Sequence, residues 1–165
     1  SESEFGEKDK AENLMIVDLM RNDLGQVCVP GSGDVAELFR TEPHPGLVHL
    51  VSDVQGELRS DVSWSEIFKA TLPPGSVSGA PKSAALKIIK AHESQRGPYC
   101  GAIGWIHGDR ADLSVAIRTF WKSGDGYIRF GTGAGITWGS NARSEWEETQ
   151  LKARTLISIA GGQLS

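Results

Sequence analysis

Two pairs of acidic residues have a spacing that could hold a metal ion. Asp9 and Glu12 stand three residues apart in one segment, and Glu145 and Glu148 stand three apart in another. Residues three apart lie on one face of a helix, so two such helices side by side would present the oxygen ligands that Mg2+ binds. Spacing alone favours the simpler alternative of two solvated helix faces, with Glu148 and Lys152 as a surface ion pair.

The segment GSVSGAPK, residues 75–82, could bind an anion. Ser78 or Gly79 can cap a helix that starts here, and the free backbone amides of a helix start, together with the Lys82 cation, suit a negative group. The same residue types serve an ordinary capped helix start equally well. The spacing of a nucleotide-binding P-loop is absent.

Two further features indicate either a ligand or a structural role. Glycines in GTGAG, residues 131–135, interrupt a predicted strand, and such glycines mark a bulge or the close approach of a ligand. Arg118 follows apolar residues in the neighbouring predicted strand, so its guanidinium needs an anionic partner, either a substrate or a protein carboxylate. His49 stands between apolar strand residues, where a histidine is more often a hydrogen-bonded core residue than a catalyst.

The elements that must position these residues indicate an α+β fold, with an antiparallel sheet and packed helices. Helices are predicted over 8–24, 63–72, 80–95 and 140–160, and strands over 48–59, 99–108, 111–122 and 126–138. Short Gly/Asp connections predict that the last three strands form an antiparallel meander. The first helix is apolar nearly all round, so we expect it to be a buried core helix that something else must help to cover.

Composition excludes several classes of protein. A length of 165 residues, with 39% apolar and 23% charged residues, is typical of about one globular domain. A net charge of −4 gives no general attraction to nucleic acid or anionic lipid. The chain has neither a membrane-spanning run nor a signal peptide, which predicts a soluble, cytoplasmic protein. Cys28 and Cys100 fit buried free thiols.

Seven segments follow one another in an order that points to a single enzyme family. They are AENLMIVDLMRNDLG, VHLVSDVQGELR, PPGSVSGAPKSAALKII, RGPYCGAIGW, LSVAIRT, GTGAGI and SEWEETQLKA. Together they resemble the chorismate-utilising enzymes: aminodeoxychorismate synthase component I, anthranilate synthase component I, and the isochorismate and salicylate synthases. Because family members are longer, the resemblance implies that residues 1–165 are the C-terminal portion of the chorismate-binding fold, a partial domain without its upstream half.

The resemblance implies a metal site at the paired acids. Mg2+ would be held by Glu12, Glu145 and Glu148, with Asp9 at a position where glutamate also occurs. The ion would hold the ring carboxylate of chorismate and draw charge from the ring as a hydroxyl leaves. Lys152 would support that carboxylate.

The resemblance also implies contacts with the rest of the substrate. The enolpyruvyl carboxylate would be held by Tyr99 and Arg118, together with the backbone of Gly133, Ala134 and Gly135. Ser76 and His49 would face the ring, with His49 assisting the departure of the hydroxyl.

The sequence departs from the family pattern in two places. Trp138 and Gly139 replace a polar residue and an aspartate, and Asn141 and Ala142 replace an acidic-proline pair, so the loop before the last helix is expected to differ. No PIKGT-like segment, whose lysine acts as the ring nucleophile in the aminodeoxychorismate branch, occurs in these residues. We therefore expect this chain alone not to convert chorismate.

Two details, Asn13 and the AIRT segment at 116–119, resemble the aminodeoxychorismate branch. The implied activity is replacement of the C4 hydroxyl of chorismate by ammonia, on the way to p-aminobenzoate and folate. A glutamine amidotransferase subunit or fused domain would supply the ammonia. The alternatives are anthranilate synthase component I, in tryptophan synthesis, and a non-catalytic module that binds Mg2+ and a dicarboxylate.

Overall fold

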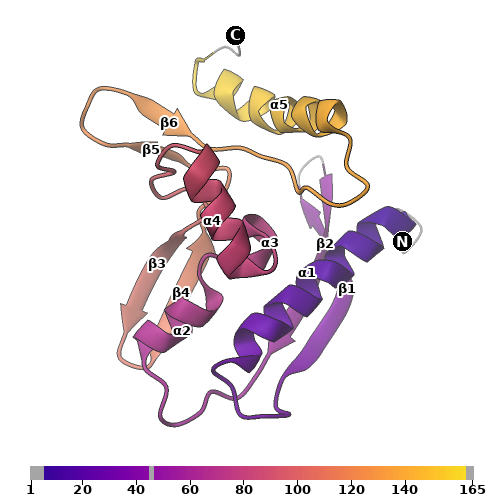
Figure 1. The fold of residues 1–165 in the computed structure, drawn as a ribbon, viewed down its shortest axis with the longest axis vertical. Helices are drawn as coiled ribbons and strands as arrows, with labels where there is room; N and C mark the ends of the chain where they lie inside the picture. The colour runs from indigo at the N-terminus through magenta and orange to yellow at the C-terminus, as the bar shows by residue number, and fades with distance from the viewer. Residues whose placement is uncertain (1–5, 45–46, 163–165) are drawn as a thin grey trace. The chain divides into compact units, whose positions relative to one another are not determined.

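Helices and small antiparallel sheets make up the computed structural model, which describes residues 6–44 and 47–162 (Figure 1). The chain divides into two compact units, residues 1–87 and 88–165, which are described in turn. The observed mixture of helices with antiparallel strand pairs confirms the predicted fold class.

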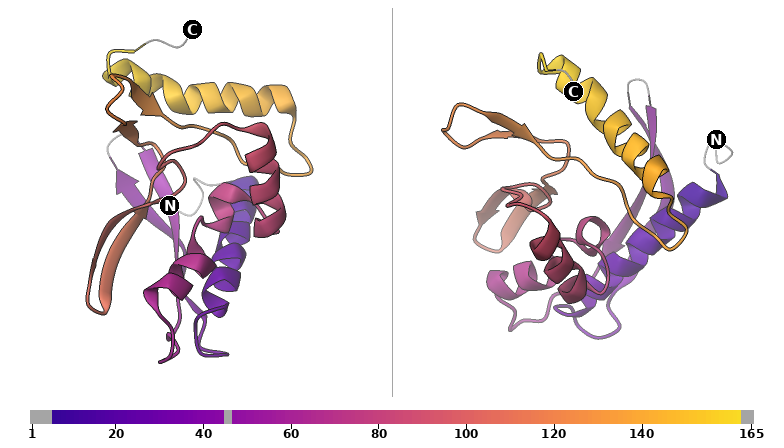
Figure 2. Two further views of the ribbon diagram at one scale, coloured as in Figure 1. Left: turned by 60° about the vertical axis from the view of Figure 1, so that its left-hand side comes forward. Right: turned by 45° about the horizontal axis from the view of Figure 1, so that its top comes forward.

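The first unit packs one long helix along a β-hairpin. Helix α1 spans Glu7–Gly25, and strand β1 (Asp34–His44) pairs antiparallel with β2 (Leu47–Gln55). The ribbon views place α1 beside this hairpin, and α1 also contacts the short helices that follow (Figures 1 and 2). A small core of Val27, Cys28 and Ala70 lies beyond the end of α1.

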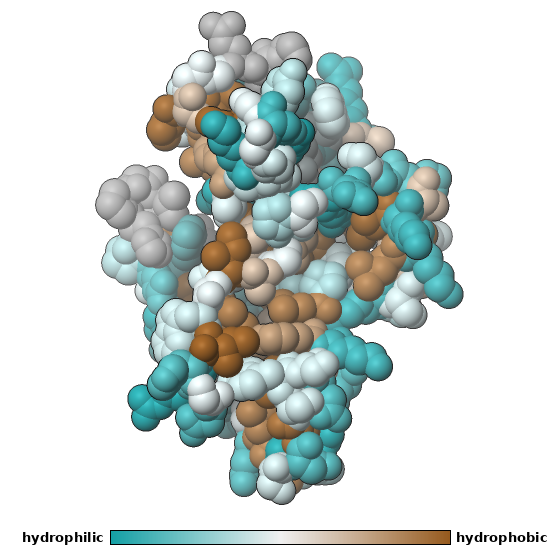
Figure 3. Space-filling model, turned by 90° about the vertical axis from the view of Figure 1, so that its left-hand side faces the viewer, coloured by the Kyte–Doolittle hydropathy of each residue, from teal (hydrophilic) through white to brown (hydrophobic). Residues whose placement is uncertain are grey.

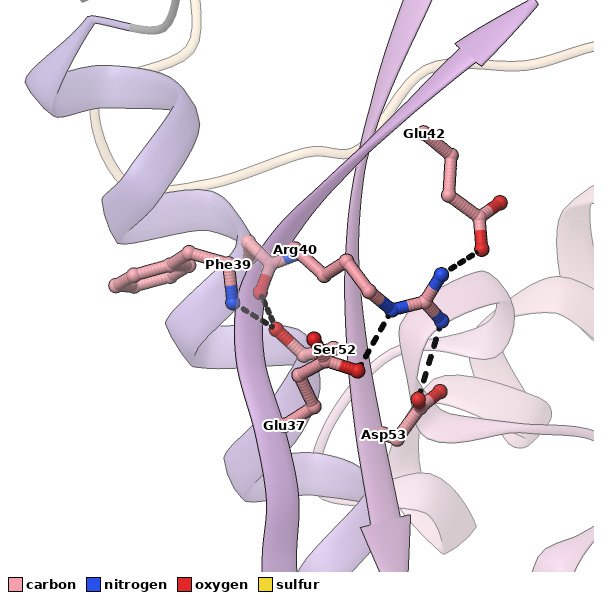
Figure 4. A network of polar contacts seen from close by, with 7 residues as sticks. Glu37, Phe39, Arg40, Glu42, Ser52 and Asp53 are labelled. Carbon is pink, nitrogen blue, oxygen red and sulfur yellow. Dashed lines mark hydrogen bonds and ion pairs between the residues drawn. The ribbon is translucent and has the colours of Figure 1, made fainter. Parts of the chain in front are cut away.

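Strand β1 is irregular in its first half. The register shifts between Val35 and Glu37 and again before Arg40, and Phe39 has a positive φ of 59°. The Phe39 amide donates to Ser52 Oγ at 3.0 Å, which satisfies a donor that the bulge removes from the strand ladder. The Arg40 guanidinium forms ion pairs with three carboxylates, as Figure 4 shows; the partners are Glu37, Glu42 and Asp53.

Helix α2 spans Trp64–Thr71 and opens on a capping box in which Ser63 is the N-cap. The Glu66 carboxylate accepts a hydrogen bond from the Ser63 amide at 2.9 Å, and this bond lowers the pKa of Glu66. The box satisfies two amide donors that a helix start otherwise leaves without partners.

The GSVSGAPK segment folds into two helices rather than into one capped helix. Helix α3 is the single turn Gly75–Ser78, and α4 spans Lys82–His92 across the boundary between the units. Gly79, with φ of 114°, ends α3, and the Ser78 hydroxyl donates to the Pro74 carbonyl at 2.8 Å. The prediction that Ser78 or Gly79 caps the next helix is therefore wrong, because both residues belong to the end of α3.

The second unit contains two separate hairpins instead of the predicted meander. Strand β3 (Ala102–His107) pairs with β4 (Arg110–Val115), and β5 (Phe120–Lys122) pairs with β6 (Ile128–Phe130). The predicted strand 111–122 breaks because Arg118 has a φ of 50° and the Ile117 amide donates back to the Val115 carbonyl at 2.8 Å. Residues 116–119 thus turn between β4 and β5.

Helix α5 spans Ala142–Ile159 and is capped by Asn141, whose side-chain oxygen accepts from the amides of Arg143 and Ser144. This cap gives a physical role to one of the departures from the family pattern. Ala153 of α5 is 1% exposed. Cys28 and Cys100 are buried free thiols, as predicted.

Apolar side chains reach the surface in several places (Figure 3). Among the described apolar residues of α1 only Val17 is buried, at 4% exposure, whereas Leu14, Met15 and Ile16 are 37–50% exposed. The expectation of a helix buried on all sides is thus wrong for this structure, while the expected uncovered apolar surface is present. In the described part of the chain, no helix is both long and apolar enough to cross a membrane.

Candidate functional site

The residues predicted to form the site are divided between the two units, and each group is described within its own unit. The first unit holds Asp9, Glu12, His49 and Ser76. The second holds Tyr99, Arg118, Gly133, Ala134, Gly135, Glu145, Glu148 and Lys152. The side chain of Asp9 lies outside the described part of the structure.

A clamp made by Asn13 places the predicted metal ligand of α1. Asn13 Nδ2 donates to the Leu50 carbonyl at 3.1 Å, and Ser52 Oγ donates to Asn13 Oδ1 at 2.6 Å. These bonds fix α1 against β2, and so they set the positions of Glu12 and His49, the sequence neighbours of Asn13 and Leu50. A single amide within an apolar helix is the sequence signal that could have indicated such a clamp.

His49 lies in β2 opposite Glu42, and it is exposed. The alternative in which His49 is a core residue is therefore wrong, because the residue is exposed. An exposed imidazole remains accessible to a substrate. Glu12 is also exposed, and it forms no ion pair with any residue that the structure describes.

Ser76 is exposed on α3, and the segment that carries it is anchored by groups that the sequence did not indicate. Lys82 Nζ lies 2.9 Å from Asp23 Oδ1 and donates to the Ala70 carbonyl at 2.6 Å. The ammonium is thus occupied by the protein, so the prediction that it offers a charge to a bound anion is wrong. No local sequence pattern connects Asp23 with Lys82, because the two residues lie far apart along the chain.

Tyr99 packs directly on the glycine-rich segment. A Cβ atom on Gly131 would overlap the Tyr99 ring, and one on Gly133 would lie 3.2 Å from Tyr99 Oη. Burial raises the pKa of Tyr99 to about 12, so its phenol stays neutral up to a higher pH than that of an ordinary tyrosine. Arg96, paired with Glu93 at 2.6 Å, lies 5.5 Å from the centre of the same ring.

The rest of the glycine-rich segment is open on its surface. Gly133 and Gly135 are exposed, and a Cβ atom on Gly135 would meet nothing within 4 Å. Ala134 is half-buried between them. A ligand could therefore approach the backbone at Gly135, whereas the glycine at 131 is needed to make room for Tyr99.

Arg118 occupies the turn between β4 and β5 rather than a strand. Its side chain is exposed, and within the described ranges it forms no ion pair with a carboxylate. The sequence allowed two kinds of partner for Arg118, a protein carboxylate or an anionic ligand. The described residues supply no such carboxylate. The guanidinium is available for a ligand.

Helix α5 carries the second acidic pair. Glu148 Oε1 lies 2.6 Å from Lys152 Nζ, and both side chains are about half exposed, at 45% and 39%. Glu145, one turn earlier, has no ion-pair partner among the residues described. The surface pair that spacing allowed is present, and a metal site shared by Glu12, Glu145 and Glu148 remains a prediction because its members belong to both units.

Comparison with known proteins gives a consistent family. The family model for chorismate binding enzymes matches residues 5–158. The chain is 46% identical over 157 residues to anthranilate synthase component 1 of Saccharolobus solfataricus, covering 94% of this chain and 37% of that protein. It is 43% identical over 152 residues to aminodeoxychorismate synthase component 1 of Salmonella typhimurium, covering 91% of this chain and 33% of that protein.

Solved structures agree with this result. Anthranilate synthase component I from Streptococcus pneumoniae aligns with a TM-score of 0.76 and 38% identity, over 92% of this chain and 35% of that one. A structure reported as a 2,3-dihydroxybenzoate-specific isochorismate synthase from Bacillus anthracis aligns with a TM-score of 0.72 and 26% identity, over 94% and 42%. The chain therefore spans about a third of the length of the curated relatives it matches.

Proposed function

Because the chain belongs to the chorismate binding enzyme family, we propose that it forms part of an aminodeoxychorismate synthase component 1. In this proposal the whole protein replaces the C4 hydroxyl of chorismate by ammonia. The observation that carries it is the exposed Arg118 guanidinium, which has no carboxylate partner among the described residues and suits a carboxylate of the substrate. The exposed Glu12 and the half-buried Glu145, which also form no ion pair within the described ranges, suit a metal ion.

Chorismate carries two carboxylates, and the second unit offers donors for one of them. Arg118 can form a bidentate pair with a carboxylate, which gives both energy and orientation. Tyr99 is protonated at neutral pH, as a tyrosine with the ordinary pKa of 10.0 would be, so it can donate a hydrogen bond to the same group. The open backbone at Gly135 allows close approach of the substrate.

The acidic residues supply donors of the right chemistry for Mg2+. Carboxylate oxygens are hard ligands, and Glu145 and Glu148 project from neighbouring turns of α5, with Lys152 holding Glu148. Glu12, and Asp9 by its position in the sequence, would complete the set. When bound, Mg2+ would act as a Lewis acid toward the ring carboxylate. Lys152 would then carry a positive charge beside that carboxylate.

His49 and Ser76 are proposed to face the substrate ring. His49 is an exposed imidazole whose position is set by the Asn13 clamp, and it would give a proton to the departing hydroxyl. Ser76 would orient the ring through its hydroxyl. Ammonia would come from a glutamine amidotransferase subunit or domain, and the product would serve p-aminobenzoate and folate synthesis.

Anthranilate synthase component 1 is the second candidate, and the 46% identity to the Saccharolobus protein favours it. The two activities share chorismate and differ in the ring position that is aminated and in the release of pyruvate. Asn13 supports the first candidate by resemblance, although its clamp would serve either reaction. A third candidate is a module that binds Mg2+ and a dicarboxylate without turnover.

The deciding experiment uses protein expressed from the complete reading frame, with chorismate, Mg2+ and an ammonium salt. We expect 4-amino-4-deoxychorismate, detected by conversion to p-aminobenzoate with a separate lyase. Anthranilate with released pyruvate would establish the second candidate, and chorismate binding without any product would establish the third.

Two matched variant pairs connect that assay to the site. Arg118→Ala should raise the KM for chorismate, whereas Arg110→Ala, in the β3–β4 hairpin, should leave it unchanged. Glu148→Gln should weaken the Mg2+ dependence, whereas Glu147→Gln, whose carboxylate pairs with Arg143 at 3.0 Å, should not. Equal effects within either pair would contradict the assignment of that site.

A further inference from the structure

We infer that the ion pair between Asp23 and Lys82 positions the segment Gly75–Gly79, and through it the hydroxyl of Ser76. The inference rests on the proposed function in so far as Ser76 faces the substrate. Asp23 and Lys82 are therefore positioning residues, which act on the substrate only through the segment they hold.

Asp23 is a buried carboxylate whose two oxygens hold different partners. Its exposure is 5%, and among the described residues it is the one charged residue that is buried. Oδ1 lies 2.9 Å from Lys82 Nζ, and Oδ2 accepts a hydrogen bond from the Gly75 amide at 3.4 Å. One carboxylate at the end of α1 is thus connected both to the start of α3 and to the start of α4.

Lys82 connects a further element to the same point. Its ammonium also donates to the Ala70 carbonyl at 2.6 Å, in the last turn of α2. Carbonyls in the last turn of a helix lack partners within the helix, so this bond satisfies one of them. The pair therefore connects the ends of α1 and α2 to Gly75 and Lys82, which lie on either side of Ser76.

The segment itself is too short to hold its own orientation. Helix α3 has four residues, and its amides at Val77, Ser78 and Gly79 bond back to Pro74 and Gly75 at 2.8–3.1 Å. A single helical turn is unstable by itself in water because nucleation is costly. Its direction must be set by the anchors on either side, the Gly75 amide before Ser76 and Lys82 after it.

Packing adds a steric constraint at the first anchor. Gly75 is buried against Leu19 of α1, and an added Cβ would lie 3.5 Å from the Leu19 Cβ. A distance of 3.5 Å is an ordinary van der Waals contact, so packing against Leu19 does not by itself fix the position of the segment along α1. The directional bonds of Asp23 are what fix its register on α1.

The first test measures hydrogen exchange in peptides covering 72–82, in protein from the complete reading frame. The variants are Asp23→Asn, Lys82→Met and the double variant. The control is Asp18→Asn, which removes a surface pair with Arg21 at 3.5 Å on the same helix.

Each single variant should speed exchange of the segment by about tenfold, and the double variant should be no faster than the worse single one. The control should change it by less than about twofold. The inference would be overturned by unchanged exchange in the single variants or by multiplied effects in the double variant. Equal acceleration throughout the β1–β2 hairpin would also overturn it, because that result indicates general destabilisation.

The second test measures kcat/KM for chorismate in a cycle of Asp23→Asn and Ser76→Ala. If Asp23 acts through Ser76, removing the Ser76 hydroxyl should lower kcat/KM in the wild-type background and have no further effect in the Asp23→Asn background. Equal losses in both backgrounds would overturn the inference. If Ser76→Ala has no effect with Asp23 intact, the role of Ser76 in the proposed function is wrong, and the exchange result still decides whether the pair holds the segment.

Discussion

The two units position their candidate residues by different means. In the first unit, polar bonds do so: Asn13 joins α1 to β2, and Asp23 joins α1 to the segment around Ser76. In the second unit, a missing side chain positions Tyr99, because the Tyr99 ring occupies the space that a Cβ of Gly131 would fill. The first unit should therefore be sensitive to the loss of a charge or an amide, and the second to added volume.

The largest expected effect is that of Asp23→Ala in the first unit. Removing one partner leaves the Lys82 ammonium without its counter-ion, and breaking a buried pair in this way costs about 3–5 kcal/mol. Urea unfolding should measure this loss. Asp18→Ala, which breaks a mostly exposed pair on the same helix, should cost no more than about 1 kcal/mol. Similar losses for the two variants would contradict the importance of the buried pair.

Added volume should have the next largest effect, in the second unit. In Gly131→Ala the new methyl group would overlap the Tyr99 ring, and overpacking of this kind costs about 1–3 kcal/mol. The matched control is Gly135→Ala, where a Cβ meets nothing within 4 Å, and we expect a change within about 0.5 kcal/mol. Thermal unfolding of the two variants checks the difference, and a Gly131 variant as stable as the control would show that the ring does not depend on the glycine.

Removing the Asn13 amide should have a smaller effect. Asn13→Ala deletes two hydrogen bonds between α1 and β2, each contributing about 1 kcal/mol, so we expect a loss of roughly 1–2 kcal/mol. Asn22→Ala, an exposed amide on the same helix, serves as the control. Denaturant midpoints with unchanged slopes would give both values. An equal shift for Asn22 would remove the reason to treat Asn13 as a clamp.

Tyr99→Phe should have the smallest effect on stability at neutral pH. Its effect should appear at alkaline pH instead. Burial raises the pKa of Tyr99 from 10.0 to about 12, so between these values the unfolded chain loses a proton that the folded chain keeps. Tyr99 should therefore cause the free energy of unfolding to fall as the pH rises from 10 to 12, with no such loss below pH 10. Unfolding at a series of pH values should show this decline in the wild type and in Tyr127→Phe, and a weaker one in Tyr99→Phe.

Periodic patterns predicted much of the fold. Apolar patterns identified α1 and α5, a helix was also predicted over 63–72 where α2 lies, and alternation identified β2. The predicted meander failed at 116–119 because the positive φ of Arg118 lies within a run that otherwise resembles a strand. Nothing in the residue types marks that position, since left-handed backbone is usually associated with glycine.

The candidate site was predictable where its chemistry is local in the chain. The acidic pair of α5 and its lysine were visible from spacing, and the glycine-rich segment was visible from composition. Asp23 and Lys82 were not paired in advance, because a contact between distant residues leaves no local pattern. The use of Gly131 as space for Tyr99 was hidden for the same reason.

The two cysteines have a consequence for kinetic measurements. The sequence contains one in each unit, and both are almost fully enclosed, Cys28 at 3% and Cys100 at 4% exposure. Burial also raises the pKa of the Cys100 thiol, which lowers its fraction of reactive thiolate. A thiol-labelling reagent can modify either sulfur only after its surroundings open. The rates of labelling at the two sites would therefore time the opening of each unit separately, without any introduced probe.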